Sequence, residues 1–130
     1  MTAKPTATDQ VSGKLTTHVL DTANGKPGAA MAISLFRVDG MTREKLLDTV
    51  TNSDGRCDAP LLEGQLLLAG TYELEFEVGE YFSVQDNDPG STNPRFLDTV
   101  LVRFGISSPA EHYHVPLLVS PFAYSTYRGS

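Results

Sequence analysis

The sequence predicts an all-β fold, an antiparallel β-sandwich with one short helix. Apolar and polar residues alternate with a period of two along several short segments, as half-buried strands require. Clusters rich in glycine, proline, asparagine and aspartate separate these segments at intervals typical of a sandwich. The clearest case is residues 71–78 (TYELEFEV), whose polar face carries Glu73, Glu75 and Glu77. We expect this strand to have one buried face and one solvated acidic face.

Six strands and one helix are expected, in an order that the patterns fix. The strands cover residues 14–21, 30–38, 45–51, 71–78, 98–106 and 111–119. The first ends at the turn cluster ANGKPG, the second at RVDG and the third at NSDGR, while the fifth follows NDPGSTNP. The alternation fails over residues 79–85 (GEYFSVQ), which predicts the short helix there. After a turn near SPFA, a final extended run reaches the last residue.

The sixth predicted strand contains a proline, Pro116. Proline cannot donate to a sheet ladder and is found mainly on edge strands or at bulges. We therefore expect this strand not to be central along its whole length. An apolar edge strand invites pairing with another chain, and no lysine or glutamate follows His114. The pattern predicts a homo-oligomer built through this region.

Length and composition indicate one domain and exclude several classes of function. With 130 residues, the chain is expected to form a flexible tail over residues 1–13 and a single domain over 14–130. A net charge of −6 disfavours nucleic acid as a partner. No secretory signal or membrane-spanning segment is recognised, so no membrane association and a cytoplasmic location are expected. The only cysteine, Cys57, cannot form an internal disulfide and is expected to be an inert thiol.

The protein has only three histidines, and all of them lie on predicted strands. His112 and His114 share one face of an extended strand, and Tyr127 of the final run could face the same space. His18 lies on the less uniformly apolar side of the first strand, and Arg56 follows the NSDG turn, where it could reach over a cavity mouth. A structural interpretation competes, because a histidine in a sandwich strand is more often a hydrogen-bonded structural group than a catalyst.

A metal site is the second interpretation of these histidines. A His-x-His pair on a strand can bind zinc or copper, with His18 as a third ligand. The only accompanying carboxylate, Glu111, projects to the opposite face. We therefore expect no metal and no cofactor. The sequence also lacks a recognisable Ser-His-Asp order, a glycine-rich phosphate loop and a pair of catalytic carboxylates.

Two longer stretches, THVLDTANGKPGAAMAISL and YHVPLLVSPFAYSTYRGS, resemble the signature regions of the transthyretin family. Within that family HVLD, SDGR, HYHVPLL and the terminal YRGS resemble the enzyme branch rather than the hormone-carrying branch, which continues beyond this point with unrelated residues. The resemblance covers nearly everything after the tail. It implies a transthyretin-like sandwich of two four-stranded sheets with a short helix. It also implies a homotetramer, a dimer of dimers whose facing sheets enclose a channel.

The resemblance to the enzyme branch also implies a reaction and a set of residues. The substrate of that branch is 5-hydroxyisourate, a labile product of urate oxidation, which is hydrolysed to 2-oxo-4-hydroxy-4-carboxy-5-ureidoimidazoline. The implied catalytic residues are His18, Arg56, His114 and Ser130, and the implied substrate-binding residues are His18, Arg56, Tyr127, Arg128 and Gly129. The histidines would position and deprotonate water, and the arginine would orient the substrate and stabilise developing charge.

Three details of this set remain open at the level of sequence. Which histidine is the base and which is the acid is undecided. Arg128 could instead anchor the C-terminus, because strand alternation points it away from Tyr127. His112 does not carry over from the family, although alternation alone would favour it.

Two other classes of function compete with the hydrolase. The first is a non-enzymatic carrier of a small aromatic ligand that uses the same channel. A carrier has no need of His18, Arg56 and His114 together, and alanine variants of these residues should still bind the ligand. The second is a structural or adhesion β-sandwich, which should stay monomeric at micromolar concentration.

Overall fold

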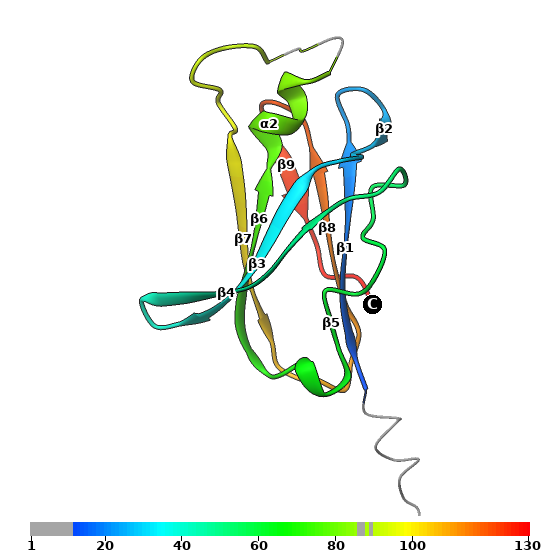
Figure 1. The fold of residues 1–130 in the computed structure, drawn as a ribbon, viewed down its shortest axis with the longest axis vertical. Coiled ribbons are helices and arrows are strands. Elements are labelled where there is room, and N and C mark those ends of the chain that lie inside the picture. Colours follow the sequence, from blue (N-terminus) through cyan, green and yellow to red (C-terminus); the bar gives the residue numbers. More distant parts are fainter. Residues whose placement is uncertain (1–11, 86–87, 89) are drawn as a thin grey trace, which may run out of the picture.

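The structure of this chain is a computed structural model that describes residues 12–85, 88 and 90–130. Two β-sheets pack face to face, with the short helix at one end of the sandwich (Figure 1). The predicted all-β sandwich with one helix is therefore confirmed. Nearly all of the predicted tail, residues 1–13, lies outside the described residues. None of the helices described is both long enough and apolar enough to cross a membrane.

The first sheet, which we call the site sheet, has five strands. Its order is β2 (Lys26–Pro27), β1 (Lys14–Asp21), β8 (Tyr113–Val119) and β9 (Tyr124–Thr126), and β5 (Leu62–Glu63) also pairs with β1. The strand β1 coincides with the predicted segment 14–21. Both β2 and β5 are two residues long, too short to show any alternation in the sequence, which explains why this sheet exceeds the four strands expected.

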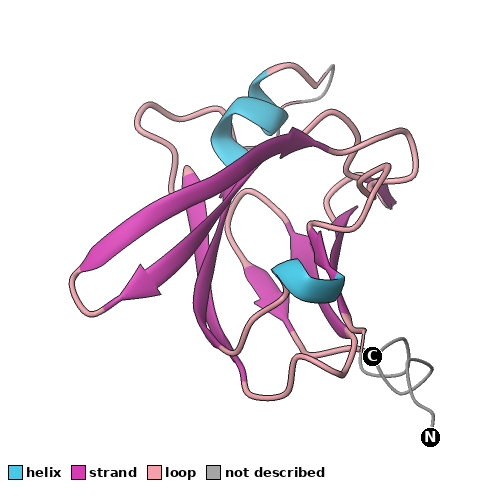
Figure 2. Ribbon diagram, turned by 60° about the horizontal axis from the view of Figure 1, so that its bottom comes forward, coloured by secondary structure: helices cyan, strands magenta, loops and turns pink. Residues whose placement is uncertain are grey.

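The second sheet, which we call the far sheet, has the four strands expected. Its order is β4 (Thr42–Val50), β3 (Ala32–Asp39), β6 (Gly70–Glu77) and β7 (Thr99–Ile106), all antiparallel. A 3₁₀ turn, η1 (Gly64–Leu66), precedes β6, and the predicted helix is α2 (Val78–Ser83). Figure 2 shows the β3–β4 hairpin extending beyond the body of the sandwich. The β4 strand is an exposed edge rich in charge, which opposes edge-to-edge aggregation.

The core lies between the two sheets, because each strand turns its alternate apolar residues inward. In β6, Tyr72, Leu74 and Phe76 are fully buried, as the alternation predicted. They meet Val19 of β1 and Leu117 of β8 in one continuous apolar cluster. Burial of such side chains contributes about 1.5–3 kcal/mol each. The sandwich is therefore fixed by inward faces, and the outward faces are left for other roles.

The outer face of β6 differs from the solvated acidic face expected. Glu73 is 5% exposed, because Arg43 of β4 and Arg103 of β7 close over it at 2.6 Å and 3.0 Å. Arg43 also reaches Glu75 at 2.6 Å. The carboxylates that the sequence pattern assigned to solvent are thus paired with arginines of the neighbouring strands.

The pairing of β1 with β8 is parallel, an exception in an otherwise antiparallel molecule. The two strands are far apart in sequence and run side by side through the middle of the site sheet (Figure 1). Their register places Thr16 opposite His114 and His18 opposite Pro116. This register brings polar residues from both ends of the chain together on one face.

Pro116 does not make β8 an edge strand, because β1 and β9 flank it. The ladder to β9 nevertheless covers only Leu117 to Val119 and then stops. The His114 N–H donates to the Gly129 carbonyl, so the nitrogen two residues further along β8 faces the same neighbour. That nitrogen belongs to Pro116 and carries no proton. The proline therefore interrupts the ladder opposite Tyr127, and β9 ends at Thr126.

Candidate active site

The outer face of the site sheet carries the candidate site. In β1 the residues that point away from the core are Thr16, His18 and Leu20, and all three are partly exposed. In β8 the alternation turns His114 to this same face. The parallel register sets the two histidines on a diagonal, with ring centroids 6.4 Å apart. Two of the predicted site residues, His18 and His114, therefore lie near each other on this face.

The His18 ring is held by the loop that follows β4. Its Nε2 lies 3.0 Å from the carbonyl oxygen of Asp54. A carbonyl can only accept a hydrogen bond, so Nε2 carries the proton. In the neutral ring the lone pair is then on Nδ1. The backbone of Asp54 thereby sets both the orientation and the tautomer of His18.

The loop of residues 52–56 is shaped to bring Arg56 beside His18. The Asn52 side-chain oxygen accepts hydrogen bonds from the N–H groups of Asp54 and Arg56, at 2.9 Å and 3.2 Å. Gly55 has a φ of +77°, a conformation that favours glycine, and its carbonyl accepts from the Val19 N–H at 2.8 Å. His18 and Arg56 consequently form a backbone bridge.

His114 is held from both sides, its ring by Thr16 and its backbone by Gly129. Its Nδ1 lies 2.8 Å from the hydroxyl oxygen of Thr16. Two backbone hydrogen bonds join His114 to Gly129, at 2.7 Å and 3.2 Å. A β-carbon on Gly129 would lie 3.1 Å from the His114 Cβ and 3.2 Å from Cδ2. Glycine thus allows the C-terminal segment to pass directly against the ring.

The electrostatics of the site keep His114 neutral. Desolvation is the largest cause of a lowered pKa for His114, and coulombic repulsion by Arg56 and by the protonated form of His18 lowers it further. The ring is therefore unprotonated at neutral pH, as a group that accepts a proton must be.

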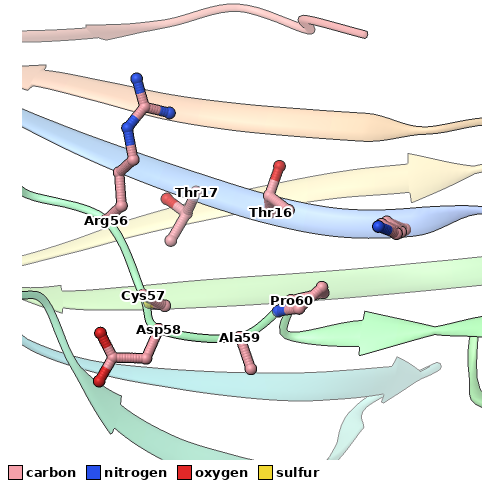
Figure 3. Close-up of a pocket in the computed structure, with 8 residues that line it drawn as sticks. Thr16, Thr17, Arg56, Cys57, Asp58, Ala59 and Pro60 are labelled. Carbon is pink, nitrogen blue, oxygen red and sulfur yellow. The ribbon is translucent and has the colours of Figure 1, made fainter.

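A pocket of about 220 Å³ opens beside these residues. It is lined by Lys14, Thr16, Thr17, Arg56, Cys57, Asp58, Ala59 and Pro60. In Figure 3 the Thr16 hydroxyl projects from β1 toward β8, and the Arg56 side chain reaches from its loop across β1 in the same direction. Burial raises the pKa of the Cys57 thiol, which agrees with the expectation of an inert thiol.

The other predicted site residues, Tyr127, Arg128 and Ser130, lie in the C-terminal segment. Arg128 donates to the Glu111 carboxylate and the His112 carbonyl, both at 2.9 Å, and stacks over the Tyr113 ring at 4.3 Å. This geometry is that of an anchor for the C-terminal segment. The exposed Tyr127 lines a different pocket, of about 240 Å³, with Arg128 and residues of β7. Ser130 is the exposed last residue, beyond the Gly129 bridge.

His112 lies outside β8, which begins at Tyr113, and is exposed. The alternation that would have paired it with His114 therefore does not extend that far. Within residues 12–85, 88 and 90–130, no group of three or more histidine, cysteine, aspartate or glutamate side chains is arranged to hold a metal ion.

Sequence reasoning missed two groups that hold the histidines, Thr16 and the Asp54 carbonyl. Thr16 shares the outward parity of His18 and could have been found from that. Its contact with His114 depends on the parallel register of β1 and β8, which no local pattern shows. The Asp54 carbonyl is a backbone group and leaves no signal in the sequence.

The chain is similar in sequence and in fold to several known proteins. Residues 15–129 match the model of the HIUase/Transthyretin family. A 5-hydroxyisourate hydrolase of Ralstonia nicotianae is 55% identical over 118 residues, which cover 91% of this chain and 99% of the relative. The solved Klebsiella pneumoniae 5-hydroxyisourate hydrolase is 34% identical, with a TM-score of 0.73, over 91% of this chain and 99% of that one. A solved (S)-allantoin synthase is 47% identical, with a TM-score of 0.85, over 92% of this chain but only 44% of that protein.

Proposed function

Since the chain belongs to the HIUase/Transthyretin family, we propose that it is an enzyme that hydrolyses 5-hydroxyisourate. The observation that carries this proposal is the convergence of His18, Arg56 and His114 on one open face of the site sheet. The curated relatives favour the hydrolase over a carrier of small aromatic ligands. A carrier would also have no use for two fixed imidazoles and a guanidinium.

The proposed reaction opens the six-membered ring of the substrate. The oxygen of water bonds to the carbonyl carbon of the cyclic amide, and the bond from that carbon to nitrogen breaks. One proton of the water ends on the leaving nitrogen, and the carbonyl carbon becomes the carboxylate of 2-oxo-4-hydroxy-4-carboxy-5-ureidoimidazoline. Water is a poor nucleophile at neutral pH, so the site must supply a base.

We assign the base to His114 and the acid to His18. For the step to balance, His18 enters it protonated on both ring nitrogens, gives one proton to the leaving nitrogen, and regains a proton from His114 through water afterwards. His114 is neutral because of its surroundings, and with Nδ1 engaged by Thr16 its Nε2 is the nitrogen left for water. His18 holds a proton against the Asp54 carbonyl, which also stabilises the ring when it becomes cationic. Arg56 offers a planar fork of donors to the developing oxyanion. In this proposal Gly129 admits the backbone beside His114 and Arg128 anchors the C-terminal segment. Tyr127 contacts substrate after its side chain turns out of the separate pocket that it lines with β7.

The test is the ultraviolet absorbance decay of 5-hydroxyisourate freshly made from urate with urate oxidase. We expect trace protein to accelerate the decay and His114→Ala to abolish most of the acceleration. His112→Ala is the matched control, because this side chain is exposed outside β8 and the hydrogen bond from Arg128 goes to the backbone carbonyl of His112. A decay rate equal to that of buffer would overturn the proposal.

Ser130 is proposed to act through its hydroxyl, next to the Gly129 bridge. Extending the chain beyond Ser130 should therefore lower the turnover number at least tenfold, because added residues would occupy the space beyond the Gly129 bridge. The measurement compares a tagged and an untagged protein, with sedimentation to show that assembly is unchanged. Equal turnover in both would remove Ser130 from the site.

We also propose the homotetramer, a dimer of dimers, that the family resemblance implies. The open face of the site sheet supports it, because Leu20 and Leu118 are partly exposed on the same face as the histidines. The cytoplasmic location remains a prediction from the sequence.

A further inference from the structure

The Thr16 hydroxyl is a polar side-chain group in contact with the His114 ring. Thr16 lies opposite His114 in the parallel ladder of β1 and β8, and its hydroxyl oxygen is 2.8 Å from Nδ1. Because Thr16 is β-branched, its side chain has few rotamers in a strand. Both partners of the contact are therefore held on adjacent rigid strands.

We infer that Thr16 is a positioning residue, which accepts a hydrogen bond from Nδ1–H of His114 and so leaves the lone pair on Nε2, facing the substrate. The inference extends the proposed hydrolase function, on which its kinetic consequence rests. In a neutral histidine only one ring nitrogen carries a proton, and the hydrogen bond made by the other decides which. A base that uses Nε2 needs the proton on Nδ1, and the Thr16 oxygen is the acceptor that the structure provides there.

The surroundings of His114 agree with a neutral ring in a fixed tautomer. The charged and titratable groups that act on it from the described elements are Arg56 of the loop and His18 of β1, and both oppose a second proton. The C-terminal segment contributes backbone groups of Gly129, which bond to the His114 backbone and leave the ring nitrogens alone. Thr16 is therefore the contact that can distinguish one ring nitrogen from the other.

The experiment reads the ring nitrogens directly. Long-range ¹H–¹⁵N correlation spectra of the full-length labelled protein are recorded above the ordinary histidine pKa of about 6.5. With three histidines in the chain, the spectrum of His114→Ala identifies the His114 signals. We expect the wild type to show a protonated Nδ1 and an unprotonated Nε2. Thr16→Val should shift both nitrogens to intermediate values, because the tautomer is no longer fixed, and Thr16→Ser should restore the wild-type pattern.

Thr17→Val is the matched structural control. Thr17 is the next residue of β1, and its side chain is buried. Its hydroxyl likewise bonds to β8, but as the donor to the Val115 carbonyl, at 2.7 Å. This variant loses a comparable hydrogen bond between the same strands without touching the His114 ring. We expect its His114 nitrogen shifts to match those of the wild type, even where its melting temperature falls.

The kinetic measurement separates positioning from folding. Thr16→Val should lower kcat about tenfold with little change in KM, and Thr16→Ser should recover most of it. A wild-type spectrum with the proton on Nε2, or wild-type nitrogen shifts in Thr16→Val, would overturn the inference. If the wild type failed to hydrolyse 5-hydroxyisourate, the proposed function would fall, while the nitrogen shifts would still decide the role of Thr16.

Discussion

Two histidines of one sheet face have different chemical surroundings, and this difference gives each a separate part in the proposed reaction. Desolvation, Arg56 and His18 keep His114 neutral, while His18 donates its Nε2 proton to the Asp54 carbonyl. A neutral ring that can accept a proton and a ring whose proton is held against a carbonyl are suited to different parts of a proton transfer. The arrangement depends on groups contributed by β1, β8 and the loop of residues 52–56.

Removing Arg56 should raise the pKa of His114. Burial would still lower this pKa, but the positive charge that also lowers it would be gone. The acid limb of the kcat profile should therefore move to higher pH, because His114 takes up a proton earlier as the pH falls. The measurement is an NMR titration of His114 in Arg56→Ala.

Arg56→Lys is the matched variant for that titration. It keeps the charge and loses the planar fork. We expect it to retain the lowered pKa of His114 while kcat/KM falls by about tenfold or more. An unchanged His114 titration in Arg56→Ala would show that the arginine does not act on this ring.

The parts of the candidate site that could be predicted are those that follow from the alternation of side chains along a strand. His18, His114 and Arg56 were identified from their positions on strands and at a turn, together with family resemblance, and the structure brings them together. The anchoring alternative for Arg128 agrees with its contacts to Glu111 and Tyr113. The hydrogen bonds that fix the imidazoles come from long-range register and from the backbone, which local sequence does not encode.

The loop of residues 52–56 controls the site through one close contact. A β-carbon on Gly55 would lie 2.4 Å from the Val19 carbonyl oxygen, at a φ of +77°. Gly55→Ala should therefore push the loop off β1 and move the Asp54 carbonyl away from His18. We expect a loss of about 1–3 kcal/mol in the free energy of unfolding and a fall in kcat of more than tenfold. Urea unfolding and the absorbance assay measure the two effects.

Gly40→Ala separates backbone strain from the site effect. Gly40 has a φ of +62° in the β3–β4 turn, but a β-carbon added there would meet no atom within 4 Å. This variant should lose stability through strain alone and keep its kcat. Equal losses of kcat in the Gly40 and Gly55 variants would contradict a specific role for the loop.

The buried carboxylate of β6 links the far-sheet strands β4, β6 and β7. Burial raises the pKa of Glu73, but the hydrogen bonds from Arg43 and Arg103 outweigh it, so the pKa is lowered overall. A lowered carboxylate pKa contributes stability above the unfolded value of about 4.3, and this contribution is lost as the pH falls through the folded pKa. Glu73→Gln should cost about 1–3 kcal/mol at neutral pH and flatten the acid loss of stability.

Glu75→Gln is the control for Glu73→Gln. Glu75 lies on the same strand and face but is more exposed and contacts one arginine instead of two. We expect it to cost less than about 1 kcal/mol. Urea unfolding between acid and neutral pH compares the variants, and equal effects of both substitutions would contradict the bridging role of Glu73.

Most of the fold was predictable because a period of two is visible in most of the long strands, although a bulge at Leu35 and Phe36 interrupts it in β3. The structure assigns β1 over the predicted residues 14–21 and α2 where the alternation fails. Which strands pair with each other could not be predicted. Strand β8 pairs in parallel with a strand about a hundred residues earlier, and Pro116 is accommodated by a gap in one ladder rather than by a place at the edge. Both outcomes depend on which strands meet, which propensity does not specify.

The assembled sandwich leaves its two outer faces chemically unlike. The far sheet presents arginine–glutamate pairs, which are stable in water. The site sheet presents the histidines together with the partly exposed Leu20 and Leu118, which the other chains of the proposed tetramer would cover. A second pair of chains would cover this apolar surface and make the proposed site a shared channel.

Placing a charge at the centre of the site-sheet face should dissociate this assembly. Leu118 points outward from β8 on the parity of His114 and pairs with the exposed Ser125. In the proposed tetramer Leu118→Arg would bury an unpaired cation, which costs several kcal/mol. Sedimentation should then show half the wild-type mass, which is expected to be four times 14.1 kDa.

Leu101→Arg places the same charge on the outer face of the far sheet, at another exposed leucine, and should leave the tetramer intact. A wild-type monomer, or equal dissociation by both variants, would show that the site-sheet face is not the surface that joins the chains.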